Sequence, residues 1–300
     1  MEFVIRISKI IIGVAVAVLG LGIAFKDTIQ THMYAYMHSS MHKSHSANGT
    51  LITLTICLAF AVRMRRNKEA VAKSVARGAV EVTTPKALAG ASDIVMLCVT
   101  TSEVVESLVF GDDGILAGIK EGATLIDFGT SIPASTRKIG AVLADKGVGM
   151  LDAPLGRTPA HAKDGLLNIM AAGDLDTYEK IKPVLDVLGE NVFHLGALGA
   201  GHVAKLVNNF MGMTTVVAMS QAFAIADRAG VDRQQLFDIM SSGPSNSPFM
   251  HFAKKYAVDG VSDLGFSIAN ASKDVGYFLA MVEEMGVRVE IAEGTSANLQ

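Results

Sequence analysis

The sequence predicts a doubly wound α/β domain followed by an all-α domain, and three observations lead to this prediction. Between residues 67 and 155, short apolar runs alternate with helical patterns, which indicates βαβ units around a parallel sheet. The segment 93–99 begins with Asp93 and continues as an uninterrupted apolar run, as expected for a strand buried on both faces. After Gly189 the patterns are mostly helical. We therefore expect the first domain at residues 1–190 and the helical domain at residues 191–300.

The predicted elements follow in order along the chain. In the first domain, the patterns predict helices over residues 69–76, 85–91, 102–108 and 134–146, and strands over residues 80–82, 93–99, 124–127 and 148–152. In the second domain, they predict helices over residues 201–230, 234–240, 250–258 and 267–285. The first of these contains no proline, and Val203, Leu206, Val207, Phe210 and Met211 recur in it at helical spacing.

Composition and charge exclude several classes of protein. Of the 300 residues, 50% are hydrophobic and 18% are charged, which excludes a disordered chain. A net charge of −3 and a pI of about 6.2 argue against a nucleic-acid partner, because phosphate binding needs clustered Lys and Arg. The two cysteines, Cys57 and Cys98, exclude a disulfide framework, so a cytoplasmic location is expected.

The mean hydropathy of +0.38 is high, and the excess comes mostly from the N-terminal region. Residues 10–25 and 51–62 are uncharged apolar runs, both shorter than the about 20 residues that a membrane-spanning helix needs. The favoured interpretation is a buried strand and helix. The alternative is a membrane-tethered protein with one of these runs in the bilayer.

An apolar run followed by glycines, between Val18 and Phe25, is similar to the start of a dinucleotide fingerprint. Such a fingerprint needs a strand, a glycine turn and a helix whose N-terminus receives the pyrophosphate. Gly20 and Gly22 supply the first two glycines, whereas Phe25 stands where Gly or Ala would allow close packing. On its own this pattern favours a structural glycine turn, and a Rossmann-type dinucleotide fingerprint is the alternative.

A second pattern places Gly201, Lys205 and Asn209 at successive i+4 spacings, so that they share one face of a helix. Glycine would let a ligand approach, and lysine can donate a proton to it. Asparagine can orient the lysine or bind a substrate hydroxyl. Taken in isolation, the pair is better explained as a solvent-exposed Lys and Asn on an amphipathic helix.

A third pattern, Gly156, Arg157 and Thr158, follows the strand predicted at residues 148–152. It is therefore expected at the edge of the sheet where ligands bind. The planar guanidinium of Arg157 suits a carboxylate, sulfonate or phosphate. The amides of Gly156 and Arg157 and the Thr158 hydroxyl would complete an anion pocket, and a surface turn with a solvated arginine is the alternative.

Taken in order, these patterns resemble the β-hydroxyacid dehydrogenase family, which includes 3-hydroxyisobutyrate dehydrogenase and tartronate semialdehyde reductase. The order is an apolar Gly-Leu-Gly, Asp-Ala-Pro-x-Gly, Gly-x-x-x-Lys-x-x-x-Asn and Lys-Asp, with a dense likeness from about residue 67 to residue 298. The resemblance implies hydride transfer between NADP or NAD and a small anionic 3-hydroxy acid or the matching aldehyde acid. It also implies a homo-dimer or tetramer, which fits the apolar Val216, Met219 and Phe223 of the long helix.

The resemblance implies roles for individual residues. Lys205 matches the general acid/base, which works best when burial lowers its pKa. Asn209 matches the residue that holds the substrate, and Lys273 and Asp274 match a pair that closes over the cofactor and the active site. Thr130 lies in a segment similar to the family's Asp-x-Ser-Thr beside the nicotinamide. The implied cofactor contacts are Gly20, Gly22, Arg66, Thr100, Thr130 and Lys273.

The sequence departs from the family pattern in three places. Gly156-Arg157-Thr158 replaces Ser-Gly-Gly, as in sulfolactaldehyde reductases, so the resemblance implies a strongly anionic head group bound by Arg157. Residues 25–61 have no family likeness and move Arg66 to about twice the usual ~20 residues from Gly20. In this register Arg66 would face the ribose 2′-phosphate and favour NADP. Relatives continue beyond the position of Gln300, so a trimmed helical domain is expected. The alternative to an enzyme is a non-catalytic family member that keeps the cleft but does not bind the cofactor productively.

Residues 32–45 contain four histidines and three methionines. On a helix His38, His42 and His45 would lie together, and imidazole and thioether ligands suit copper or zinc. No acidic or cysteine ligand completes the set, so no metal site is predicted.

Overall fold

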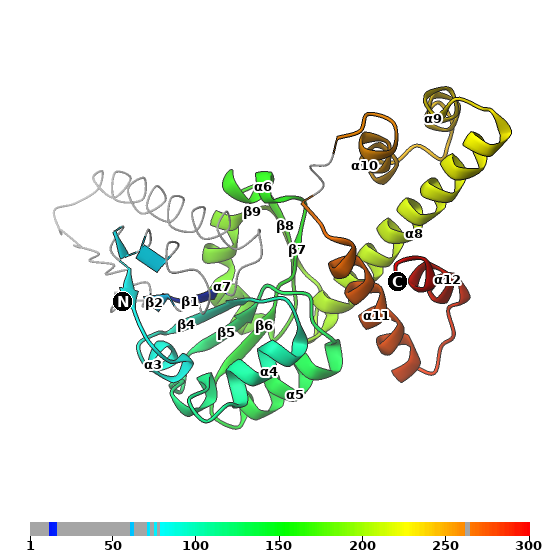
Figure 1. Cartoon of the computed structure of the whole chain (residues 1–300). Coiled ribbons are helices and arrows are strands. Elements are labelled where there is room, and N and C mark those ends of the chain that lie inside the picture. The colour runs from blue at the N-terminus through cyan, green and yellow to red at the C-terminus, as the bar shows by residue number, and fades with distance from the viewer. Residues whose placement is uncertain (1–11, 17–60, 63–70, 73–74, 77–78, 262–264) are drawn as a thin grey trace, which may run out of the picture. The chain divides into compact units, whose positions relative to one another are not determined.

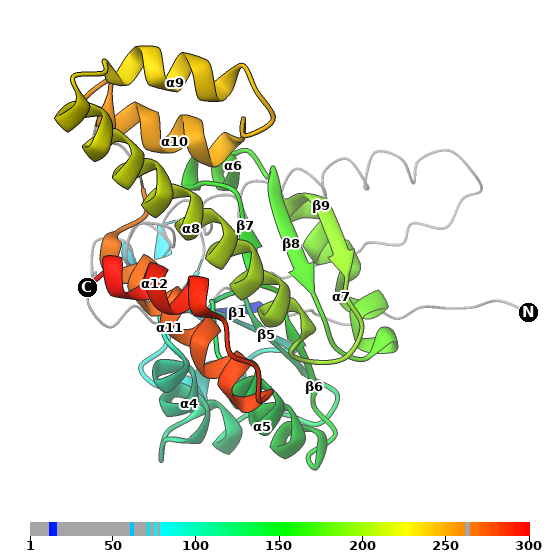
Figure 2. The ribbon, with the colours of Figure 1, turned by 90° about the vertical axis from the view of Figure 1, so that its right-hand side faces the viewer.

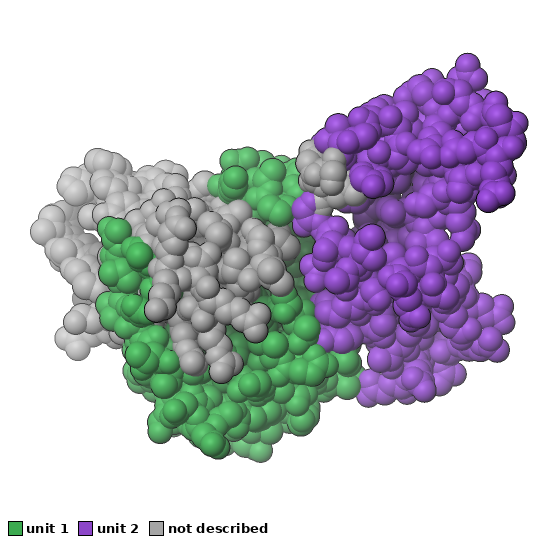
Figure 3. Space-filling model, in the orientation of Figure 1, with its two compact units in different colours: residues 1–202 green, residues 203–300 purple. Residues whose placement is uncertain are grey.

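The computed structural model describes residues 12–16, 61–62, 71–72, 75–76, 79–261 and 265–300. The chain divides into two compact units, Met1–His202 and Val203–Gln300, which Figure 3 colours separately. Three predicted cofactor contacts, Gly20, Gly22 and Arg66, lie outside the described residues, as do Phe25 and the histidines of residues 32–45. The predictions that rest on them therefore stay predictions.

The first unit is built around a six-stranded parallel sheet with the order β3-β2-β1-β4-β5-β6. Its strands are β1 (Ile12–Val16), β2 (Ala61–Val62), β3 (Val80–Glu81), β4 (Ile94–Cys98), β5 (Thr124–Asp127) and β6 (Gly149–Asp152). The chain runs outward from β1 to β3, returns to β4 beside β1, and runs outward again to β6. Ligands of doubly wound sheets bind at such a reversal, beyond the carboxyl ends of the strands. The predicted fold class is confirmed.

Helices cover both faces of this sheet. They are α3 (Pro85–Gly90), α4 (Ser102–Phe110), α5 (Pro133–Ala144) and α7 (Leu175–Leu188). Alternate residues of a strand point to opposite faces. Val95 and Leu97 of β4 thus join a core with α3, α4 and α5, whereas Ile94 and Met96 join a second core with α7. Figure 1 shows α4 and α5 next to each other against the sheet.

A second sheet, with the order β7-β8-β9, belongs to the same unit (Figure 2). β7 (Leu155–Gly156) runs antiparallel and β9 (Gly189–His194) parallel to the central β8 (Leu167–Ala171). Helix α6 (Pro159–Lys163) follows β7. The sequence patterns predict none of these elements, nor α7. Pro183 inside α7 explains part of the failure, because an internal proline is normally a sign that a helix ends.

The second unit is helical, as predicted. Helix α8 (Ala200–Ala229) begins in the first unit and continues into the second, where α9 (Arg233–Ser241), α10 (Pro248–Ala257), α11 (Ile268–Glu284) and α12 (Glu290–Asn298) follow. Leu206 of α8 packs with α11 and α12, whereas Met219 and Phe223 pack with α9 and α10. Met219 and Phe223 are 5% and 2% exposed, so the idea that they form a dimer interface is wrong: they are core residues of their own unit.

One described helix, α8, is long and apolar enough to cross a membrane by length and composition. Several of its apolar side chains instead contribute to the cores of the second unit. The described parts of the two N-terminal apolar runs are the strands β1 and β2, and β1 lies between β2 and β4 in the sheet. Each run therefore contributes a strand to the large sheet, and the burial predicted for the runs stays a prediction.

Candidate active site

Two of the predicted cofactor contacts follow neighbouring strands of the large sheet. Thr100 lies two residues beyond the end of β4 and Thr130 three residues beyond the end of β5, and both side chains are half-buried. Because β4 and β5 are parallel and adjacent, both threonines lie at the edge where doubly wound sheets bind ligands. Helix α4 begins at Ser102, and the hydroxyl of the preceding Thr101 caps its N-terminus by accepting the amide of Val104 at 3.3 Å.

The loop that carries Thr130 is held by a buried carboxylate. Asp127 Oδ1 accepts the Gly129 amide and Asp127 Oδ2 accepts the Ser131 hydroxyl, both at 2.8 Å. A Cβ on Gly129 would lie 2.8 Å from the Val99 carbonyl oxygen, so only glycine fits there. Thr130 therefore sits in a loop whose backbone is fixed on both sides.

Asp152 at the end of β6 caps the N-terminus of α8. Its Oδ1 accepts the Gly199 amide and its Oδ2 accepts the His202 amide, both at 2.7 Å. Burial raises the pKa of Asp152, and His202 and the two amides oppose this rise. A Cβ on Gly201 would lie 2.2 Å from the Met170 carbonyl oxygen and 2.8 Å from Asp152 Oδ2. The glycine therefore permits close packing of α8 on the strands, not the approach of a ligand as the sequence suggested.

The second unit brings the predicted catalytic residues together between α8 and α11. Asn209 Nδ2 donates to Asp274 Oδ2 at 2.7 Å, and these residues are 7% and 2% exposed. Lys273 Nζ forms an ion pair with Asp274 Oδ1 at 2.9 Å and lies 4.9 Å above the centre of the Tyr277 ring. Asp274 thus orients both Asn209 and Lys273.

Lys205 lies one helical turn before Asn209 and is partly buried. Burial lowers the pKa of its ammonium group, and the positive charge of Lys273 lowers the pKa further. The carboxylate of Asp274 opposes both effects. A lysine with a lowered pKa gives up and regains a proton more readily near neutral pH, as a general acid/base must.

Arg157 is engaged by protein groups in this structure. Its guanidinium forms an ion pair with Glu190 of β9, and its Nη1 donates to the Leu166 carbonyl oxygen at 2.8 Å. Among the described residues other than glycine, Arg157 alone has a positive φ, of 73°. A non-glycine residue in this region is uncommon and marks a constrained turn.

The neighbours of Arg157 have different surroundings. The Thr158 hydroxyl is 2.7 Å from His161 Nδ1, and Thr158 is the N-cap residue that precedes α6. Gly156 is buried on β7 opposite Asn168 of β8. Asp127, Asp152, His202 and Glu190 are not predicted from the sequence as site residues, because their partners are distant in the chain.

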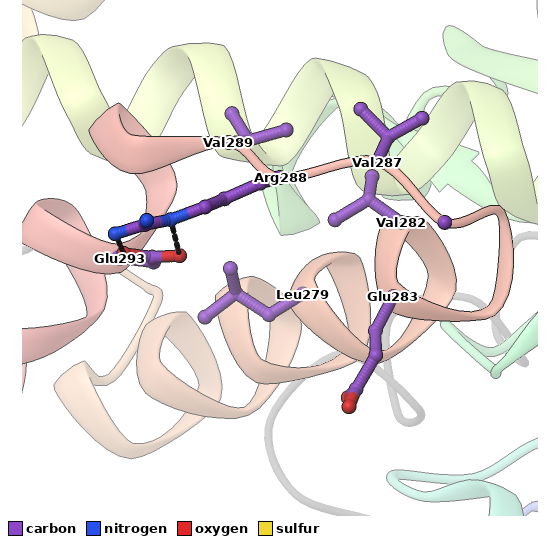
Figure 4. A pocket seen from close by; sticks show the side chains of 8 residues that line it. Leu279, Val282, Glu283, Val287, Arg288, Val289 and Glu293 are labelled. Carbon is purple, nitrogen blue, oxygen red and sulfur yellow. Dashed lines mark hydrogen bonds and ion pairs between the residues drawn. The ribbon is translucent and has the colours of Figure 1, made fainter.

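A pocket of about 370 Å³ lies in the second unit at the turn between α11 and α12 (Figure 4). Leu279, Val282, Val287 and Val289 form its apolar wall. The guanidinium of Arg288 pairs with Glu293 beside it, with Nε 3.1 Å from Oε1. None of the predicted site residues lines this pocket.

A doubly wound sheet with threonines at its binding edge, followed by helices that carry a lysine of lowered pKa, is the architecture of a dinucleotide-dependent oxidoreductase. The family model for the NAD binding domain of 6-phosphogluconate dehydrogenase matches residues 59–196. The model for the NAD-binding region of NADP-dependent 3-hydroxyisobutyrate dehydrogenase matches residues 199–300.

Individual relatives agree with these matches. The chain is 31% identical to 2-(hydroxymethyl)glutarate dehydrogenase of Eubacterium barkeri over 218 residues, which cover 72% of each chain. It is 32% identical to NAD-dependent L-serine dehydrogenase of Pseudomonas aeruginosa over 227 residues, covering 75% of this chain and 74% of the relative. The crystal structure of 3-hydroxyisobutyrate dehydrogenase from Salmonella typhimurium has the same fold, with a TM-score of 0.76, 21% identity and coverage of 96% and 92%. The chain belongs to the β-hydroxyacid dehydrogenase family of NAD(P)-dependent enzymes.

Proposed function

We propose that this enzyme transfers hydride between NADP or NAD and a small anionic 3-hydroxy acid or the matching aldehyde acid. The proposal rests on one observation above all: Lys205, with its lowered pKa, lies one turn from Asn209, which Asp274 orients. The relatives described above are named for 2-(hydroxymethyl)glutarate, L-serine and 3-hydroxyisobutyrate, which are small hydroxy acids. Substrates of this kind include 3-hydroxyisobutyrate, tartronate semialdehyde and sulfolactaldehyde.

Lys205 acts as the general acid/base in this proposal. The bound nicotinamide nucleotide supplies or accepts the hydride at the substrate carbon. During carbonyl reduction the Lys205 ammonium donates its proton to the carbonyl oxygen, and during oxidation the neutral amine takes the hydroxyl proton. The carboxylate of Asp274 favours the protonated form of Lys205, because its negative charge opposes the lowering of the lysine pKa. Asn209 Nδ2 donates one hydrogen to Asp274, and its Oδ1 accepts Asn208 Nδ2 at 3.3 Å. The second N–H and the remaining lone pair of Oδ1 can bind a substrate hydroxyl.

The first unit fits a dinucleotide by its strand order and by the loops at its binding edge. A nucleotide that enters at the β1/β4 reversal reaches Thr100 after β4 and Thr130 after β5. We assign these two threonines as cofactor contacts. Lys273 is assigned to close over the cofactor, and it would exchange its pairing with Asp274 to do so. Gly20, Gly22 and Arg66 complete the assignment from the sequence, with Arg66 favouring NADP.

Arg157, Thr158 and the Gly156 amide are assigned to the anionic head group of the substrate. The guanidinium of Arg157 can form two parallel hydrogen bonds with a carboxylate or sulfonate. Since Arg157 is paired with Glu190, a substrate anion would have to replace Glu190. Glu190 therefore competes with the substrate and should weaken binding of a weakly anionic one.

The first test is a titration of the purified protein with NADPH and NADH, following nicotinamide fluorescence. Micromolar binding is expected, and tighter binding of NADPH would support the role of Arg66. The bound enzyme is then given sulfolactaldehyde, tartronate semialdehyde, the aldehyde of 3-hydroxyisobutyrate and neutral glyceraldehyde. Turnover of the acids but not of glyceraldehyde is expected. No binding of either nucleotide would refute the proposal and favour a non-catalytic family member.

We also propose that the enzyme is a cytoplasmic homo-dimer or tetramer. Exposed apolar side chains on α8 support an interface formed by the second unit: Val207 is 43% exposed, Met211 58% and Ile225 66%. Light scattering after size exclusion measures the mass of the assembly. A monomer at micromolar concentration, or recovery of the protein in washed membranes, would contradict this proposal.

A further inference from the structure

Four polar side chains form a closed cluster inside the first unit. Asp127 ends β5, Thr136 lies on α5, Asp152 ends β6, and His202 lies in the first turn of α8. Each of the four is at most 1% exposed. Burying two carboxyl groups and an imidazole is costly unless they are paired, so the cluster needs a physical reason.

His202 touches the other three members. Its Nδ1 is 2.8 Å from Thr136 Oγ1, and its own amide donates to Asp152 Oδ2 at 2.7 Å. Its Nε2 faces Asp127 Oδ2 at 3.7 Å and has no hydrogen-bond partner among the described residues. A distance of 3.7 Å is too long for a hydrogen bond but short enough for a strong electrostatic interaction.

The surroundings of Nε2 indicate which form of the ring is present. A lone pair on Nε2 would point at the carboxylate of Asp127 and repel it, whereas an N–H bond there is attracted. A hydrogen on Nε2 leaves Nδ1 free to accept the Thr136 hydroxyl in the neutral ring. Asp152 Oδ2, 3.7 Å from Nδ1, is the other charged group that faces the ring.

The ring joins two segments that the reaction uses. Asp127 holds the loop of Thr130 through Gly129 and Ser131, and Nε2 of His202 faces the same carboxylate. His202 precedes Lys205 by three residues in α8, so the two are neighbours on the helix surface. His202 therefore belongs to the first turn of α8, and its ring faces the carboxylate that supports the Thr130 loop.

We propose that His202 is a positioning residue, which sets the first turn of α8 against the Asp127-anchored loop and thereby fixes Thr130, the proposed nucleotide contact. This inference rests on the proposed function. It requires that nucleotide affinity and kcat change together when the ring is altered. If His202 only stabilised the fold, its substitution would lower the unfolding temperature and leave nucleotide affinity and kcat unchanged in the folded enzyme.

Two substitutions distinguish the contribution of Nδ1 of His202 from that of Nε2. His202→Asn keeps a polar atom near the position of Nδ1, next to Thr136, and removes the group that faces Asp127. His202→Gln reaches the position of Nε2 and retains a donor there. His194→Asn is the matched control, because His194 is also a hydrogen-bonded ring of the first unit, bound to the Gly173 carbonyl oxygen at 2.9 Å.

Nucleotide Kd by fluorescence and single-turnover rates are measured on full-length protein, well below the unfolding temperature of every variant. We expect His202→Asn to raise the nucleotide Kd about tenfold and to lower kcat by about tenfold or more, since a hydrogen-bond-sized loss or a small misalignment has effects of this order. His202→Gln should recover most of both effects. His194→Asn should change neither by more than about twofold, as is usual for a substitution that affects only stability.

The inference is overturned if folded His202→Asn binds nucleotide and turns over like the wild type, or if Gln and Asn impair the enzyme equally. If neither His202 variant folds, Thr136→Val takes their place, since it removes the partner of Nδ1. It should then raise Kd and lower kcat together, and unchanged values would reject the inference. Failure of the wild type to bind nucleotide would instead reject the proposed function, and the inference with it.

Discussion

Lys205→Met should have opposite effects on turnover and on stability. Methionine has a similar length and no charge, so it removes the proton donor while it fills most of the same space. General acid/base groups contribute about 10²- to 10⁴-fold to a rate. At about 1.36 kcal/mol for each factor of ten, the variant should lose about 2.7–5.4 kcal/mol of transition-state stabilisation.

The stability effect follows from the pKa of Lys205. Burial and Lys273 lower this pKa from its ordinary value of 10.5 in the folded protein. A lowered lysine pKa means that the ammonium destabilises the fold at neutral pH, and that this penalty disappears as pH rises through the folded and then the unfolded pKa. Each unit of lowering corresponds to about 1.36 kcal/mol. At pH 7, Lys205→Met should therefore raise the free energy of unfolding.

Three measurements test this reasoning: kcat from the oxidation of the reduced nucleotide, nucleotide Kd from fluorescence, and urea unfolding at pH 7. Turnover should fall, Kd should stay within about threefold, and unfolding should need more urea. In the wild type, kcat/KM for carbonyl reduction should fall on the basic side with a midpoint below 10.5, because the ammonium is the active form. Lys120→Met, at an exposed lysine, is the control. A Lys205→Met variant with wild-type turnover would remove Lys205 from the catalytic role.

Three further predictions follow from the contacts of the first unit. Arg157→Ala should raise KM for an anionic substrate, because it removes the proposed anion-binding group. Glu190→Gln should lower this KM, because Glu190 forms an ion pair with Arg157 and competes with the substrate. Steady-state kinetics that leave both KM values unchanged would remove Arg157 from the site. Gly201→Ala should destabilise the protein by about 3 kcal/mol in urea unfolding, since its Cβ would lie 2.2 Å from a carbonyl oxygen, and a wild-type midpoint would contradict the packing. Burial raises the pKa of Cys98 to about 12, so little reactive thiolate is expected in the folded protein at pH 8. In a Cys57→Ser variant, which leaves Cys98 as the single thiol, a disulfide reagent should therefore react far more slowly with the native protein than with the unfolded protein. Equal rates would show that the Cys98 thiol is accessible.

Much of the fold is predictable because the signals are local. Residues 124–127 form β5 with the predicted bounds, and the helix predicted at residues 201–230 is α8. The likeness of Lys205 and Asn209 to a catalytic pair depends on helical spacing, which a sequence displays directly. In contrast, β7 has two residues and α7 contains Pro183, so neither produces the periodic pattern on which prediction depends.

The sequence alone was sufficient for the fold class, for β4, β5 and β6 of the large sheet, for the main helices of the second unit and for the family, since each depends on neighbours along the chain. Tertiary structure decided the partners. Asn209 meets Asp274 from 65 residues away, and Asp152 caps α8 across 47 residues to Gly199. It also assigned Gly201 to close packing and paired Arg157 with Glu190. Contacts of this kind depend on how sheets and helices pack in three dimensions, and no periodicity in the chain encodes them.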